Sequence, residues 1–182
     1  MSAFQIQTIE SAPEGSKPPL EKLRRTFGMV PNIAGVIANS PVLAKIFVDL
    51  FQGVHSGTFT EAEIQTLLLT NAVTNACTWA VAFHSVLALK QGLDPADVRA
   101  IRERRTPKEP RYAALSVFAR NLIESRGHVS EEAIAAFQSA GFRPEQALEV
   151  LAVSAASTIT NYAGSMAGPP LESMFQDQAW RV

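Results

Sequence analysis

The chain has 182 residues, of which 47% are hydrophobic and 18% are charged, and its formal net charge is -1. A chain of this length builds one domain with a sizeable core, and its near-zero charge offers no basic surface for nucleic acid or for an anionic membrane. The single cysteine excludes an intrachain disulfide, and the first residues lack the basic and apolar regions of a signal peptide. We therefore expect a cytoplasmic protein.

Frequent helix start and stop signals, with almost no strand signals, predict an all-α fold of about eight to ten helices. Residues 1–16 are expected to form an extended N-terminal arm, because Pro13 and Gly15 interrupt any periodic pattern, and residues 17–182 to form a single helical domain. Prolines open most of the expected helices, and glycines close several of them. In chain order the expected helices cover residues 20–27, 32–40, 42–54, 60–91, 96–104, 110–126, 131–140, 145–166 and 171–178.

The segment 60–91 is predicted to be the core of this domain. It begins with a capping box, in which Thr60 and Glu63 bond to each other's backbone amides. A bend near Asn75, or a break before Cys77, is expected inside it.

Two stretches of the chain, residues 64–89 and 150–171, contain no Asp, Glu, Lys or Arg. Both hold many Ser, Thr and Asn side chains, whose transfer into lipid would be costly. We therefore predict buried helices with subunit contacts rather than membrane spans. Asn161 and Tyr162, deep in the second stretch, are predicted to make specific hydrogen bonds or to line a cavity.

Cys77, Ala80 and His84 are spaced as i, i+3 and i+7, so they share one stripe of a helix. A thiol and an imidazole on such a stripe can face one cavity, where the imidazole relays a proton and the thiolate is the nucleophile. The same residues also suit a plain core, because a lone cysteine behaves as a small apolar residue. The pattern by itself leaves both interpretations open.

The stretch EAEIQTLLLTNAVTNACTWAVAFHSVLALKQGL resembles the core of the carboxymuconolactone decarboxylase-like superfamily, which includes the alkyl hydroperoxide reductase D-like peroxidases. The family motif is a Glu, eleven residues, then Cys-x-x-Cys-x-x-x-His and a downstream glycine. Upstream, FGMVPNIAGVIANSPVLAKIF is similar to the Gly-x-Val-Pro-Asn segment and following Ser-Pro of the peroxidase-related branch. Over residues 27–100 the resemblance implies an all-α bundle that assembles as trimers or hexamers. It also implies alkylhydroperoxidase or peroxiredoxin-type antioxidant activity that needs no cofactor.

Two of the four motif positions differ in this chain. Cys77 and His84 match the first cysteine and the histidine, whereas Ala80 replaces the second cysteine and Gln65 replaces the glutamate. A dithiol cycle needs two sulfurs, one to be oxidised and one to resolve it as a disulfide. Gln65 can form hydrogen bonds but cannot take up a proton. The usual dithiol cycle is therefore expected to be impaired.

Three functions remain open. The first is a one-cysteine peroxidase, in which Cys77 and His84 act on a small hydroperoxide and an external thiol is the reductant. The second is a non-redox enzyme like the lactone decarboxylase branch, in which His84 is the acid or base for a lactone-like substrate. The third is a non-catalytic, small-molecule-binding or structural homo-oligomer.

The residues expected to support the Cys77 and His84 pair come from the same segment. No His, Cys, Asp or Glu cluster has the spacing of a zinc site, so neither a metal nor another cofactor is expected. The expected supporting residues are Gln65, Asn71, Asn75, Trp79 and Ala80.

Overall fold

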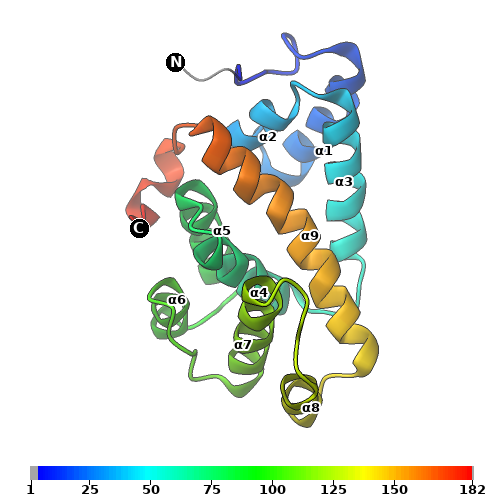
Figure 1. Cartoon of the computed structure of the whole chain (residues 1–182). Helices are drawn as coiled ribbons and strands as arrows, with labels where there is room; N and C mark the ends of the chain where they lie inside the picture. Colours follow the sequence, from blue (N-terminus) through cyan, green and yellow to red (C-terminus); the bar gives the residue numbers. More distant parts are fainter. Residues whose placement is uncertain (1–3, 182) are drawn as a thin grey trace.

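A computed structural model describes residues 4–181 and builds them from nine α-helices and two short 3₁₀ helices, η1 and η2 (Figure 1). No strand occurs within this range, so the predicted all-α fold is confirmed. The elements are η1 (Glu14–Ser16), α1 (Lys17–Phe27), α2 (Asn32–Ile37), α3 (Pro41–His55), α4 (Glu61–Thr74), α5 (Thr78–Lys90), α6 (Pro95–Arg102), α7 (Pro110–Glu124), α8 (Glu131–Ser139), α9 (Pro144–Ala167) and η2 (Ser173–Gln178).

Helix α4 lies at the centre of the domain, where it packs against α5, α6, α7 and α9 (Figure 1). It begins at the predicted capping box: the Thr60 hydroxyl accepts from the Glu63 amide at 3.2 Å, and the Glu63 carboxylate accepts from the Thr60 amide at 2.9 Å. The second oxygen of Glu63 accepts two bonds from the Arg111 guanidinium, at 2.7 and 2.9 Å. These bonds fix where α4 starts and therefore which of its side chains face α5.

A tight turn separates α4 from α5, so the predicted break before Cys77 is observed. Asn75 ends α4, and Ala76 adopts a left-handed conformation with φ 54°. The amide of Ala76 donates to Val73 O at 3.1 Å, and the amide of Cys77 donates to Ala72 O at 3.0 Å. This is the double-bonded helix ending that usually contains glycine at the left-handed position. Cys77 consequently precedes α5 as its N-cap residue.

The described part of the N-terminal arm, residues 4–16, packs against the start of the helical domain. The amide of Gln7 donates to Gly35 O at 3.1 Å, and the Ser16 hydroxyl donates to Ala38 O at 2.8 Å. Residues 1–3 of the predicted arm lie outside the described range.

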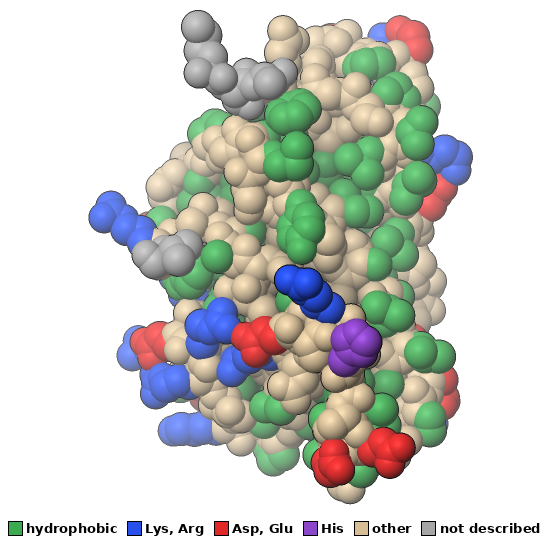
Figure 2. Space-filling model, in the orientation of Figure 1, with side chains coloured by type: hydrophobic (Ala, Val, Ile, Leu, Met, Phe, Trp, Pro, Cys, Tyr) green, Lys and Arg blue, Asp and Glu red, His purple; other side chains and the backbone are tan. Residues whose placement is uncertain are grey.

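The outer face of α9 is unusually apolar for an exposed surface. Leu148, Leu151, Tyr162 and Met166 are all exposed. Tyr162, predicted to make specific hydrogen bonds or to line a cavity, is 58% exposed and lines a surface hollow of about 460 Å³ together with residues of α2 and α3. Figure 2 shows hydrophobic side chains distributed over this face, whereas charged side chains gather at its lower left. Assembly into trimers or hexamers stays a prediction. Within residues 4–181 no helix combines the length and the hydropathy of a membrane span.

Candidate functional site

His84, in the middle of α5, is held by Gln65 of α4. The Nδ1 atom of His84 lies 3.0 Å from Gln65 Oε1, and both side chains are buried. Because an amide oxygen only accepts hydrogen bonds, this contact places the ring proton on Nδ1 and leaves a lone pair on Nε2. The two motif positions are therefore brought together, with an uncharged hydrogen bond between them.

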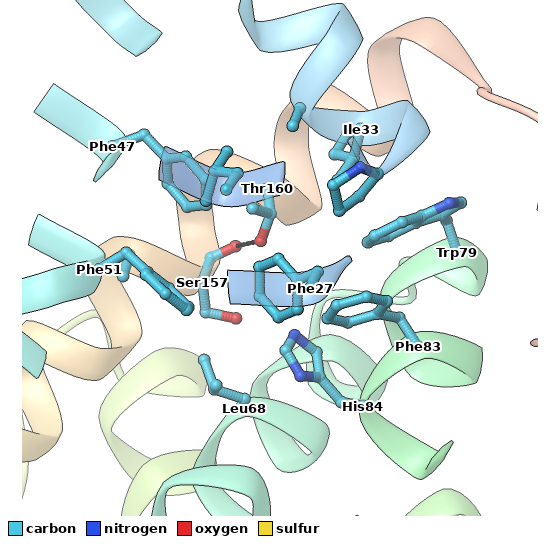
Figure 3. A pocket seen from close by; sticks show the side chains of 14 residues that line it. Phe27, Ile33, Phe47, Phe51, Leu68, Trp79, Phe83, His84, Ser157 and Thr160 are labelled. Atoms are coloured by element: carbon cyan, nitrogen blue, oxygen red, sulfur yellow. Dashed lines mark hydrogen bonds between the residues drawn. The ribbon is translucent and has the colours of Figure 1, made fainter. Parts of the chain in front are cut away.

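The His84 ring faces a small cavity with aromatic walls (Figure 3). The cavity has a volume of about 40 Å³, which is room for two or three water-sized groups, since one water needs about 10–15 Å³. Its polar side chains come from α5 and α9, and its remaining walls come from α1–α5 and α9. The lining residues are Leu23, Phe27, Pro31, Ile33, Ala34, Phe47, Phe51, Leu68, Trp79, Phe83, His84, Ala156, Ser157 and Thr160.

Burial keeps His84 uncharged. The pKa of His84 falls from 6.5 to about 3, chiefly because desolvation disfavours the imidazolium and secondarily through the electrostatic influence of His55. At neutral pH the cavity therefore contains a neutral imidazole, which accepts a hydrogen bond at Nε2. It is a weak base as long as no negative charge lies beside it.

A larger and more polar hollow lies next to this cavity, and the two spaces share part of their lining. It has a volume of about 570 Å³ and includes Gln52, Glu61 and Gln91. Five residues line both spaces, so the hollow leads towards His84 through an aromatic partition: Phe27, Phe51, Leu68, Phe83 and His84. The Phe27 and Phe51 rings contact each other with centroids 5.7 Å apart.

Cys77 lies apart from this cavity, among neither set of lining residues. Its side chain is 2% exposed and packs against the backbone of Gly164 in α9, where an added Cβ would lie 2.9 Å from Cys77 Sγ. Burial raises the pKa of the Cys77 thiol, while the amides of Ala80 and Trp79 and the Ser165 hydroxyl oppose that shift. No hydrogen bond joins Cys77 to His84 within the described chain.

The other predicted supporting residues divide between the cavity and the surrounding core. Trp79 forms a cavity wall, stacks on Phe83 at 4.8 Å and donates from Nε1 to the Glu172 carboxylate at 2.9 Å. Asn71 is buried and donates to the Ser154 hydroxyl at 3.3 Å. Ala80 is fully buried in the core, and Asn75 caps the end of α4. Of the seven residues predicted for the site itself, His84 and Trp79 line the cavity and Gln65 bonds to His84, whereas Cys77, Asn71, Asn75 and Ala80 do neither.

Sequence reasoning missed the residues that other helices bring to the cavity. Phe27 ends α1, Phe51 lies in α3 and Ser157 lies in α9, so only tertiary packing unites them. Asn161 was predicted to make a specific hydrogen bond, and it donates from Nδ2 to the Ser157 hydroxyl at 3.0 Å. Across residues 4–181 no group of three His, Cys, Asp or Glu side chains is placed to hold a metal ion.

Solved structures show which fold this is. No protein-family model and no curated protein matches the sequence. A peroxidase-related protein from Ralstonia eutropha, described as an alkylhydroperoxidase AhpD core, superposes with a TM-score of 0.83 at 19% identity, over 96% of this chain and 94% of that one. A peroxidase-related protein from a Silicibacter species gives 0.79 at 17% identity, over 96% and 93%.

The debrominase Bmp8, in a Cys-to-Ala variant complexed with 2,3,4-tribromopyrrole, gives a TM-score of 0.78 at 18% identity, covering 98% of this chain and 96% of that one. The chain thus has the AhpD-like fold that the resemblance implied. At these identities the likeness establishes the fold and leaves the activity to be argued from the site.

Proposed function

We propose that this chain, an AhpD-like fold without the second motif cysteine, binds a small and mostly apolar molecule in the His84 cavity. In this proposal His84 accepts a hydrogen bond, and in a reaction the proton, from that molecule. The observation that carries it is the His84–Gln65 contact, which occupies Nδ1 at 3.0 Å and leaves Nε2 as an acceptor inside an aromatic cavity. This favours the second and third of the functions open from the sequence.

The electrostatics favour a proton acceptor over a proton donor at His84. A pKa of about 3 means that the ring carries no proton on Nε2 at neutral pH. A ligand that loses a proton to Nε2 leaves an anion beside an imidazolium, and that ion pair raises the pKa of His84 at the moment of transfer. Gln65 supports the cation by accepting from Nδ1, although it does not take the proton.

The size of the site sets the size of the ligand. The inner cavity of about 40 Å³ admits only a few non-hydrogen atoms, whereas the outer hollow of about 570 Å³ holds a larger body. A ligand longer than a few atoms reaches His84 when Phe27 or Phe51 turns aside and joins the two spaces. The fold neighbour complexed with a tribrominated pyrrole supports a small apolar ring with one polar group as the ligand type.

A binding series tests this proposal. Pyrrole and 2,3,4-tribromopyrrole are titrated into wild type, His84→Phe and Cys77→Ala, with the exposed His128→Phe as matched control. We expect Cys77→Ala and His128→Phe to bind as wild type does, and His84→Phe to lose about ten-fold in affinity, the effect of one lost hydrogen bond to a buried acceptor. Unchanged binding in His84→Phe, or lost binding in Cys77→Ala, refutes the proposal.

A one-cysteine peroxidase is the second candidate, and the position of Cys77 at the N-terminus of α5 favours it. The amides of Ala80 and Trp79 there lower the pKa of the thiol, although burial outweighs them. The thiolate would attack the outer oxygen of a hydroperoxide, breaking the O–O bond, releasing an alcohol and leaving a sulfenic acid. Two external thiols would then reduce it, forming their own disulfide and water.

Peroxide treatment followed by intact-mass trapping of the sulfenic acid tests this second candidate. Oxidation of Cys77 faster than free cysteine, and slowed in His84→Ala, would establish it in place of the His84 proposal. We expect Cys77 to react more slowly than free cysteine, because its thiol is buried and protonated.

A further inference from the structure

Ser157 of α9 is the second polar group of the inner cavity. Its side chain is 1% exposed and lines the cavity together with His84. Figure 3 shows the two side chains entering the same space from different helices, α9 and α5. The other hydroxyl there belongs to Thr160, which donates to the backbone oxygen of Ser157 at 2.9 Å.

The hydroxyl proton of Ser157 is available to a ligand. The Ser157 oxygen accepts from Asn161 Nδ2 at 3.0 Å, and Asn161 is itself fully buried in the same helix. With the Asn161 amide oriented in this way, no group among residues 4–181 accepts the Ser157 O–H, and Asn161 Oδ1 is itself buried without a hydrogen-bond partner. A buried donor without an acceptor is costly, and such groups are normally satisfied by water or by a ligand.

The cavity therefore presents a donor, Ser157 O–H, in the same space as the acceptor His84 Nε2. A hydroxyl group is the simplest partner for both, because a single oxygen donates one bond and accepts others. A ligand N–H can donate to His84 Nε2 but cannot accept from Ser157. An ether or carbonyl oxygen can accept from Ser157, but its lone pairs repel the lone pair on His84 Nε2.

We propose that the His84 cavity selects a small apolar molecule carrying one hydroxyl group, which donates to His84 Nε2 and accepts from Ser157 Oγ. This inference rests on the proposed function and names its ligand class. If the hydroxyl proton passes to Nε2, the Ser157 O–H remains bonded to the resulting oxyanion. Asn161 then acts as a positioning residue, since its side-chain amide donates to the Ser157 hydroxyl and directs it.

The chain supplies a close control for Ser157. Ser154 lies about one turn earlier in α9, is buried, and accepts from an asparagine amide in the same way, from Asn71 Nδ2 at 3.3 Å. Ser154 does not line the cavity. Removing either hydroxyl breaks one serine–asparagine bond, but only Ser157 is expected to affect a ligand.

The test compares dissociation constants for phenol, pyrrole and thiophene, which offer a hydroxyl, an N–H alone and neither group. In wild type we expect phenol to bind most tightly and thiophene most weakly. Ser157→Ala is expected to weaken phenol about five-fold and pyrrole less than two-fold, which is the size of one hydrogen bond. Ser154→Ala is expected to leave both unchanged. Ser157→Cys, a weaker donor of similar shape, is measured alongside in case the alanine variant folds poorly.

The outcomes separate the two proposals. If Ser157→Ala and Ser157→Cys leave the phenol-to-pyrrole ratio as in wild type while His84→Phe weakens binding about ten-fold, the hydroxyl inference is wrong and the His84 site stands. If no probe binds wild type, or binding does not depend on His84, the proposed function and this inference fail together.

Discussion

The start and the middle of α5 illustrate how one helix serves two purposes. Cys77, at the start, fills a core position against Gly164 with its thiol protonated. His84, seven residues later, is bonded to Gln65 and turns its free nitrogen into a cavity. The motif pairs these residues by spacing, but the packing separates them. Burial acts on both groups, stabilising the neutral thiol in one and the neutral imidazole in the other.

The largest expected effect is the loss of folding stability at acidic pH that is caused by the buried, neutral His84. The unfolded chain binds one more proton than the folded chain between pH 6.5 and about pH 3, because the folded pKa of His84 is lowered. The stability from neutral His84 is therefore complete above pH 6.5 and falls with decreasing pH by about 1.4 kcal/mol per pH unit. Urea unfolding at several pH values is expected to show a shallower fall in His84→Gln, whereas His128→Gln follows wild type. Equal slopes in wild type and His84→Gln would contradict neutral burial.

The next effect is the loss of stability expected when the contact between Cys77 and Gly164 is overpacked. Gly164→Ala places a Cβ 2.9 Å from Cys77 Sγ, and such overpacking costs about 1–3 kcal/mol. Cys77→Ala removes the sulfur, so the double variant is expected to be more stable than the sum of the single losses predicts, by about 1 kcal/mol. Gly53→Ala in α3, where a Cβ meets no atom within 4 Å, is the control and should not destabilise the chain. Additive costs at Gly164 and Cys77 would mean that the two residues do not touch.

A loss of stability of about the same size is expected when Gln65 is replaced. Gln65→Leu leaves His84 Nδ1–H without an acceptor and should cost about 1–3 kcal/mol, measured by chemical unfolding, most of it recovered in Gln65→Glu. The Glu variant adds a negative charge beside the ring and should raise the pKa of His84. Gln91→Leu, in the outer hollow, is the matched control. A Gln65→Leu variant as stable as wild type would show that the 3.0 Å contact contributes nothing.

The last prediction concerns the rate at which a thiol reagent labels Cys77. Its burial and protonation predict labelling more than ten-fold slower in the folded chain than in urea. Labelling at the same rate in both states would place the thiol at the surface and reopen the redox interpretation.

Much of the fold follows from local signals in the sequence. The capping box of Thr60 and Glu63 marks the start of α4. Gly28 and Gly168 end α1 and α9 in left-handed conformations. The turn between α4 and α5 has no such signal, because alanine occupies the left-handed position at Ala76. The helix phase linking Cys77 to its neighbours was consequently uncertain.

The candidate site was only partly predictable for a related reason. Gln65 and His84 follow from the motif, since neighbouring helices bring them together. Phe51 and Ser157 belong to α3 and α9 and reach the cavity only through long-range packing. The Ser157–Asn161 pair was visible as an i, i+4 spacing in the charge-free stretch 150–171, but nothing local showed which side of α9 would face His84.

Side-chain nitrogen NMR of His84 across a pH titration, in wild type and Cys77→Ala, tests whether His84 is a neutral acceptor that is independent of the thiol. We expect a neutral ring protonated at Nδ1, a pKa far below 6.5, and the same titration in both proteins. A pKa near 6.5 would show that burial does not keep the ring neutral, and a pKa that moves when the thiol is removed would show that His84 and Cys77 are coupled. Either result would overturn the assignment of His84 as an independent, neutral acceptor.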